Sequence, residues 1–244
     1  NEDEVRKSVI VPPDSQFTIA TYYRLYFHAL IPEGIDKLLY IDTDTIVIGD
    51  LKELYNIDIG NAPIAAVADP VPELRSDLGL YKEGQYFNAG VLLIDIKNWR
   101  EQKVTENALQ FILDHPEKIQ YVDQDALNAT LIDKWFRIDK KYNLSYLYVS
   151  LQVPAKALIK DAVIIHYTTS LKPWHCLAKN KLRYLYQRYL KMSPKSNEKK
   201  YIDFKWTLPI VRTFVRMRIK EFYFNKEIYK IFPIKGWINA GELY

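Results

Sequence analysis

Lys37-Leu-Leu-Tyr-Ile-Asp-Thr-Asp-Thr-Ile46 contains an apolar run that leads directly into two carboxylates, Asp42 and Asp44, separated by a single residue. A run so short and so apolar predicts a strand buried on both faces, as in the parallel sheet of an α/β protein. Ligands bind such sheets just beyond the carboxyl ends of the strands, which is where the two acids fall. Because carboxylates this close repel each other unless a cation or a proton lies between them, the pair is a candidate metal site. The alternative is a solvated loop after a strand.

Length and composition indicate a globular protein. The chain has 244 residues, of which 48% are hydrophobic and 26% charged, enough for one large domain or a domain with an appendage. Its single cysteine, Cys176, excludes an intramolecular disulfide and is compatible with a reducing compartment. No apolar run approaches the roughly 18 residues needed to cross a bilayer. These features predict a cytoplasmic protein.

Charge is distributed unevenly along the chain. Residues 172–235 hold 17 Lys/Arg against 4 Asp/Glu, whereas the remainder holds 17 Lys/Arg against 26 Asp/Glu. We therefore expect a body over residues 1–192 and a basic, aromatic tail over residues 193–244 that is attracted to an anionic membrane surface. A helical pattern in the tail places apolar residues beside cations: Val211, Val215, Ile219 and Phe222 beside Arg212, Arg216 and Lys220. Such a helix suits the inner face of a membrane, and equally suits docking on the protein's own body.

Two further predicted strands also end in potential ligands. Residues 64–68 lead into Asp69, and residues 162–166 end in His166, at the sheet edge where Asp42 and Asp44 are expected. Two carboxylates and an imidazole suit a six-coordinate divalent metal such as Mn²⁺, with Mg²⁺ as the alternative, and leave positions for a substrate. Such a metal neutralises a diphosphate, so we expect the substrate to carry one. Lys172, held by the Pro-Trp pair that follows it, is a candidate contact to the same diphosphate.

Five ordered motifs between residues 18 and 175 resemble those of glycosyltransferase family 8, which includes bacterial lipopolysaccharide galactosyl- and glucosyltransferases. Each motif is weakly specific alone, but the five in order form a strong signal. They are Thr21-Tyr-Tyr-Arg-Leu25, Leu39-Tyr-Ile-Asp-Thr-Asp44, Tyr86-Phe-Asn-Ala-Gly-Val-Leu-Leu93, Asp123-Gln-Asp-Ala-Leu-Asn128 and His166 with Lys172-Pro-Trp-His175.

The resemblance implies an α/β, A-type glycosyltransferase fold, Rossmann-like, with a mixed, mainly parallel sheet and flanking helices, to which the charge pattern adds the basic helical C-terminal tail. It implies a retaining hexosyltransferase that moves glucose or galactose from a UDP-hexose to a glycan or glycolipid acceptor, with Mn²⁺ as cofactor. Lipopolysaccharide or another cell-surface polysaccharide is the expected product. By motif position, the roles fall on ten residues: Asp42, Asp44 and His166 for the metal; Lys172 for the leaving diphosphate; Arg24 beside the donor; and Asp69, Asn88, Ala89, Asp123 and Gln124 around the transferred sugar.

Breaking the sugar–phosphate bond develops negative charge on UDP and oxocarbenium character on the sugar. The resemblance places Gln124 beneath the anomeric carbon, and because an amide is a poor nucleophile we favour front-face attack by the acceptor hydroxyl. A covalent intermediate through Asp123 is the alternative. Residues 70–86 and 140–160 are the loops expected to meet the acceptor.

The chain departs from the family pattern in two places. Nothing before Thr18 resembles the usual nucleoside-binding segment, and residues 168–171 replace a stretch that is often glycine-containing.

Two other functions remain open from the residues. Asp42-Thr-Asp44 also resembles the nucleophile loop of haloacid-dehalogenase-like phosphohydrolases, although later residues offer Asn88 and Gln124 where that fold needs Ser/Thr and Lys. A noncatalytic module that binds anionic surfaces through the tail is the second. Aromatic residues among the tail's cations are also typical of single-strand nucleic-acid binders, but lipid or a charged glycolipid fits a glycosyltransferase body better. We expect no nucleic-acid partner.

Overall fold

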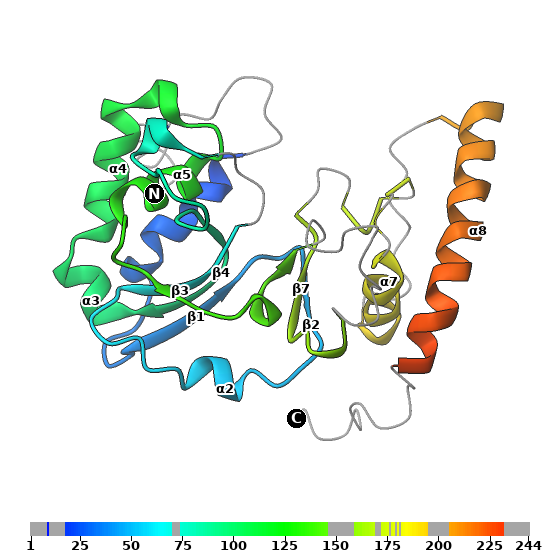
Figure 1. Ribbon diagram of the computed structural model, residues 1–244, viewed down its shortest axis with the longest axis horizontal. Coiled ribbons are helices and arrows are strands. Elements are labelled where there is room, and N and C mark those ends of the chain that lie inside the picture. The colour runs from blue at the N-terminus through cyan, green and yellow to red at the C-terminus, as the bar shows by residue number, and fades with distance from the viewer. Residues whose placement is uncertain are drawn as a thin grey trace.

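The computed structural model describes residues 9, 18–69, 74–145, 159–168, 172–175, 177–178, 180, 182–194 and 205–231 (Figure 1). Its strands are β1 (Lys37–Ile41), β2 (Thr45–Val47), β3 (Ile64–Ala68), β4 (Phe87–Asp95), β5 (Phe136–Arg137), β6 (Leu144–Ser145) and β7 (Ile164–His166). Its α-helices are α2 (Lys52–Tyr55), α3 (Ile96–Glu101), α4 (Val104–Asp114), α5 (Val122–Thr130), α7 (Arg183–Met192) and α8 (Leu208–Ile231). Short 3-10 helices are η1 (Ile19–Ala29), η2 (Ser76–Leu78), η3 (Pro116–Lys118) and η4 (Lys140–Tyr142). Residues 70–73 and 146–158 of the predicted acceptor loops lie outside the described residues, as do residues 169–171 of the stretch that departs from the family pattern.

A four-stranded sheet in the order β1-β4-β3-β5 positions Asp42 and Asp69. Both β1 and β3 are antiparallel to β4, so they run in the same direction and end at the same edge. Ile41 pairs with Val91 and Ala68 with Phe87, near the start of β4. Asp42 and Asp69, the residues after β1 and β3, therefore flank the first residues of β4.

A three-stranded sheet in the order β2-β7-β6 brings in the histidine. β7 is antiparallel to β2, and Thr45 pairs with His166. Because β2 begins one residue after Asp44, this register places the imidazole next to the Asp42–Asp44 pair. The predicted convergence of these side chains is thus confirmed, but His166 comes from a strand of the second sheet and not from the edge of the sheet that carries Asp42 and Asp69.

The expectation of a mixed sheet with flanking helices is confirmed, whereas two details differ. Among the described strands, three pairings are antiparallel and two are parallel, so parallel neighbours do not dominate. A parallel pair needs a long crossover that is usually helical, and β3 reaches β4 through a connection whose described part holds only η2. β1 is half-buried rather than buried on both faces, because it lies at the edge of its sheet.

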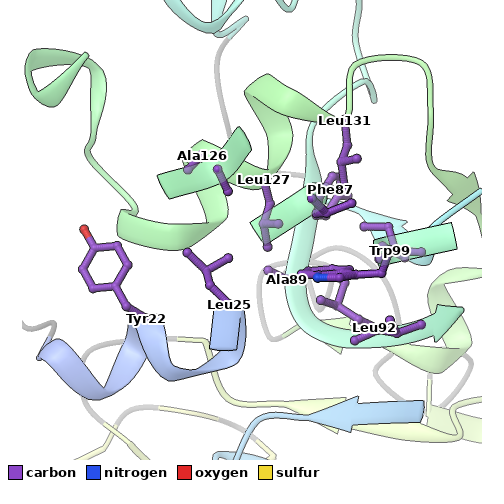
Figure 2. Packing of buried hydrophobic residues seen from close by; sticks show 14 of the residues in the cluster. Tyr22, Leu25, Phe87, Ala89, Leu92, Trp99, Ala126, Leu127 and Leu131 are labelled. Atoms are coloured by element: carbon purple, nitrogen blue, oxygen red, sulfur yellow. The ribbon is translucent and has the colours of Figure 1, made fainter. Parts of the chain in front are cut away.

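Helices α3, α4 and α5 lie on one side of the four-stranded sheet, and β2, β7, α7 and α8 lie on the other (Figure 1). Tyr22 and Leu25 of η1 are fully buried and face α5, where Leu127 is also fully buried (Figure 2). Burying a leucine side chain stabilises a fold by about 2 kcal/mol. Arg24, between Tyr22 and Leu25, therefore sits on an element held firmly against α5.

The predicted helical tail is present in part, as α8, while residues 195–204 and 232–244 lie outside the described residues. Among the helices that the structure describes, α8 included, none combines the length and apolar character needed to span a membrane.

Candidate active site

Asp42, Asp44 and His166 form a compact cluster in which one ligand atom from each lies within 4.8 Å of the others. His166 Nε2 is 3.2 Å from Asp44 Oδ1 and 3.7 Å from Asp42 Oδ2. Gly90 makes the cluster possible, because a Cβ atom there would lie 2.1 Å from His166 Cε1 and 2.8 Å from Asp42 Oδ2. The close backbone approach leaves the three side chains converging on one point.

The charge state of the cluster suits a divalent cation. Burial by itself would raise the pKa of Asp44, but His166 and the Lys172 ammonium outweigh it and lower that pKa to about 2. Lys172 Nζ donates to Asp44 Oδ2 at 2.6 Å and to the Tyr167 carbonyl at 3.0 Å, and its side chain is 25% exposed. Ionised oxygens and an imidazole nitrogen are a donor set that binds Mn²⁺, so these residues fit the metal that the sequence predicts.

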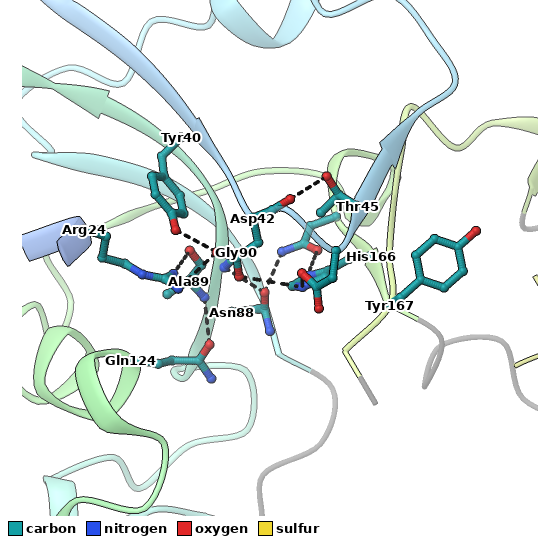
Figure 3. Close-up of polar contacts among 12 residues, drawn as sticks. Arg24, Tyr40, Asp42, Thr45, Asn88, Ala89, Gly90, Gln124, His166 and Tyr167 are labelled. Atoms are coloured by element: carbon teal, nitrogen blue, oxygen red, sulfur yellow. Dashed lines mark hydrogen bonds and ion pairs between the residues drawn. The ribbon is translucent and has the colours of Figure 1, made fainter. Parts of the chain in front are cut away.

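Arg24 is a buried cation that lies between Asp42 of the metal cluster and Asp123 of α5 (Figure 3). It donates to the Ala89 carbonyl and to Asp42 Oδ1, the latter at 3.1 Å, and its Nε lies 2.7 Å from Asp123 Oδ2. Tyr40 stacks against the guanidinium and donates its hydroxyl to Asp42 Oδ1 at 2.7 Å. Burial opposes the charge of Arg24, but the two aspartates outweigh burial and raise its pKa. Arg24 thus holds protein carboxylates rather than standing as a free surface charge.

Asp123 is the most electrostatically perturbed of the predicted site residues. Its side chain is 1% exposed, and burial raises its pKa to about 7, with Arg24 opposing the rise and Asp42 adding to it. Despite the short distance to Arg24 Nε, neither carboxylate oxygen accepts a hydrogen bond of normal geometry from the described residues. A buried carboxylate held by one ion pair therefore keeps the capacity to accept further hydroxyl or N–H donors.

The remaining predicted sugar-side residues gather around the start of β4. Asn88 Nδ2 donates to Asp69 Oδ2 at 2.9 Å, and the Ala89 N–H donates to Gln124 Oε1 at 2.9 Å. With its N–H on Gln124 and its carbonyl on Arg24, Ala89 positions two other site residues through its backbone. All ten predicted residues therefore fall in one connected region.

Four residues of this region were not predicted: Tyr40, Tyr86, Asp125 and Asn143. Tyr40 could have been found, because it lies two residues before Asp42 on a strand and so shares its face. Asp125 is fully buried and accepts from Tyr86 Oη at 2.6 Å and Arg75 Nη1 at 2.8 Å. Asn143 follows η4 and carries no sequence signal that separates it from a surface turn residue.

Comparisons with known proteins agree with this geometry. A profile of the family described as Glycosyl transferase family 8 matches residues 3–178. General stress protein A of Bacillus subtilis (strain 168) is 34% identical over 189 residues, covering 72% of this chain and 66% of its own. Lipopolysaccharide 1,2-glucosyltransferase of Escherichia coli (strain K12) is 31% identical over 175 residues, covering 68% and 52%. The chain thus spans roughly half to two thirds of the length of these relatives.

Among solved structures, the galactosyltransferase LgtC, crystallised with donor and acceptor sugar analogues, superposes with a TM-score of 0.67. It is 24% identical, and the match covers 81% of this chain and 75% of that one. At that sequence identity the similarity establishes the fold alone, and it confirms the predicted A-type glycosyltransferase fold. The profile match extends over most of the chain, so the protein belongs to glycosyl transferase family 8.

Proposed function

We propose that this chain is the catalytic part of a retaining hexosyltransferase that uses Mn²⁺ and a UDP-hexose, glucose or galactose. The acceptor is a glycan or glycolipid of a lipopolysaccharide or related cell-surface polysaccharide, a proposal supported by relatives whose names describe such transfers. The observation that carries it is the convergence of Asp42, Asp44 and His166 beside the buried, under-bonded Asp123. Family membership favours transfer over the phosphohydrolase and binding-module alternatives.

The metal side of the site would stabilise the leaving group. Asp42, Asp44 and His166 would hold the metal, which when bound supplies positive charge to the diphosphate. Lys172 brings a second cation to the same place, and its partial exposure leaves the ammonium accessible to phosphate oxygens. Together they would stabilise the charge that develops as UDP departs.

The sugar side would bind hydroxyl groups and stabilise the sugar's developing positive charge. Asp123 offers carboxylate oxygens in need of donors, and Asp69 and Asn88 present further polar groups at the same strand ends. Gln124 is a weak nucleophile whose oxygen already accepts from the Ala89 N–H. This bonding supports front-face attack by the acceptor, with Asp123 as the nucleophile of the alternative, double-displacement route.

The decisive assay measures UDP release from UDP-glucose and UDP-galactose by the full-length protein, with Mn²⁺ or with a chelator. We expect Mn²⁺-dependent release that falls at least 100-fold in Asp44→Asn, since ionised ligands hold the metal. Asp36→Asn, at an exposed position just before β1, is the matched control and should retain activity. Absence of release with every UDP-hexose, together with phosphate release from p-nitrophenyl phosphate, would contradict the proposal.

We also propose that residues 193–244 form a tail that binds the anionic inner face of a membrane. Val211, Val215 and Ile219 are 40%, 48% and 52% exposed on α8, so these three apolar side chains are not covered by the part of the body that the structure describes. The neighbouring Arg212, Arg216 and Lys220 are exposed too. An exposed apolar stripe bordered by cations suits an interfacial helix. The side chain of Phe222 lies outside the described residues.

Charge reversal tests this surface. Changing the three α8 cations to glutamate should weaken sedimentation with phosphatidylserine vesicles and leave UDP-hexose hydrolysis unchanged. Reversal of Lys52, Lys97 and Lys134, exposed lysines on the body, gives the same net charge and should leave vesicle binding intact. Equal loss in both triple variants would indicate nonspecific attraction and contradict a role for α8.

A further inference from the structure

A continuous line of hydrogen bonds joins the metal cluster to the sugar side through Asn143. His166 Nδ1 lies 3.0 Å from Asn143 Oδ1, and Asn143 Nδ2 donates to Asn88 Oδ1 at 2.8 Å. Asn88 Nδ2 then donates to Asp69 Oδ2 at 2.9 Å. Asn143 is 1% exposed and His166 4%, so water does not compete freely for these bonds.

The direction of every bond in this line is fixed at Asn88 by a backbone donor. The Gly90 N–H donates to Asn88 Oδ1 at 3.0 Å, and an N–H can only donate, so the Asn88 amide must present its oxygen to Gly90 and Asn143 and its NH₂ group to Asp69. Asn143 must then turn its NH₂ group to Asn88 and its oxygen to His166. Only a protonated Nδ1 can satisfy that oxygen, which leaves Nε2 as the nitrogen facing Asp42 and Asp44.

We propose that Asn143 is a positioning residue that fixes the tautomer of His166 and, through Asn88, couples the metal to the sugar side. The inference rests on the metal and sugar assignments of the proposed function. A ligating histidine whose second nitrogen donates to a fixed acceptor keeps both its ring orientation and its basicity. Asn143 supplies that acceptor and, from the same amide, holds a residue at the sugar side.

The first test needs neither metal nor substrate. Long-range ¹H–¹⁵N correlation spectra of the metal-free protein at pH 8 report which ring nitrogen of His166 carries the hydrogen. We expect Nδ1 to carry it in the parent protein. A neutral His166 with its hydrogen on Nε2 would overturn the inference whether or not the protein proves to be a transferase.

Two substitutions separate the two hydrogen bonds of the Asn143 amide. Asn143→Leu keeps a similar volume and removes both bonds. The Kd for Mn²⁺, measured from free Mn²⁺ by electron paramagnetic resonance, should therefore rise about 10- to 100-fold. Asn143→Asp keeps the oxygen for His166 and removes the donor to Asn88. Its Mn²⁺ affinity should stay within a few fold of the parent, while its affinity for UDP-hexose falls about tenfold relative to its affinity for UDP.

Asn128 provides the matched control. It is equally buried, and its amide bonds the backbone of Phe87 without contacting His166. Asn128→Leu should lower thermal stability and leave Mn²⁺ affinity unchanged. A folded Asn143→Leu protein with parental Mn²⁺ affinity would overturn the proposal. If that variant does not fold, Asn143→Asp decides. Loss of its Mn²⁺ affinity, or an unchanged ratio of its affinities for UDP-hexose and UDP, would also overturn the proposal.

Discussion

Asp123→Asn should stabilise the protein at alkaline pH while lowering its activity about 100-fold. The side chain is buried, and its pKa rises from an ordinary 3.8 to about 7, so the folded protein bears a cost for ionising it. The sign follows from linkage. A carboxyl group whose pKa is higher in the folded than in the unfolded protein favours folding at pH values below its unfolded pKa. That benefit is lost as the pH rises through the folded pKa. At about 1.4 kcal/mol for each tenfold change in proton affinity, the cost is about 4 kcal/mol at pH 8 and below about 2 kcal/mol at pH 5.

Asparagine keeps the shape of the side chain and cannot ionise. Arg24 retains Asp42 and the Ala89 carbonyl as partners in the variant. Urea denaturation without Mn²⁺ should therefore give a gain in the free energy of unfolding that is about 3 kcal/mol larger at pH 8 than at pH 5. UDP-hexose hydrolysis should fall about 100-fold, as when one electrostatic stabiliser is removed. A variant that is less stable than the parent at pH 8, or equally stabilised at both pH values, would refute the reasoning.

Two further substitutions test the packing around the site. Gly90→Ala should raise the Kd for Mn²⁺ at least 100-fold in a folded protein, because the added methyl group would overlap the His166 ring, and parental Mn²⁺ affinity would contradict the cluster's geometry. Tyr86→Phe removes a hydroxyl that donates to Asp125 and accepts from Gln124 Nε2, which should lower kcat about tenfold with KM for UDP-hexose unchanged and cost about 1 kcal/mol of stability. Unchanged kcat with lowered stability would make this hydroxyl purely structural.

Local sequence patterns predicted the parts of the site that depend on strand ends. Asp42 and Asp69 each follow an apolar run, so their position at a sheet edge needs only the strand period and the direction of the chain. The position of Tyr40 could have been predicted from the same strand period. The direction of β4 was not, because an antiparallel neighbour and a parallel one bury similar apolar residues.

Residues that depend on distant partners could not be predicted from local pattern. Asn143 meets Asn88 across 55 positions of the chain, and Arg75 meets Asp125 across 50. Neither pairing leaves a periodic trace, since Asn143 and Arg75 lie in irregular segments beside short 3-10 helices, far along the chain from Asn88 in β4 and Asp125 in α5. The family motifs marked Asp123 and Gln124 as functional, but the raised pKa of Asp123 follows from its burial and from the nearby Asp42, against the opposing charge of Arg24, and no motif reveals these surroundings.

The metal cluster is the centre of the proposed mechanism, and anomalous X-ray scattering tests it most directly. Crystals of the full-length protein grown with MnCl₂ and UDP would be measured at the manganese absorption edge. The expected result is a single strong anomalous peak that marks a manganese ion bound by Asp42, Asp44 and His166 and by the diphosphate of UDP. UDP bound without a peak between these three side chains, or manganese held by other residues, would contradict the proposed active site.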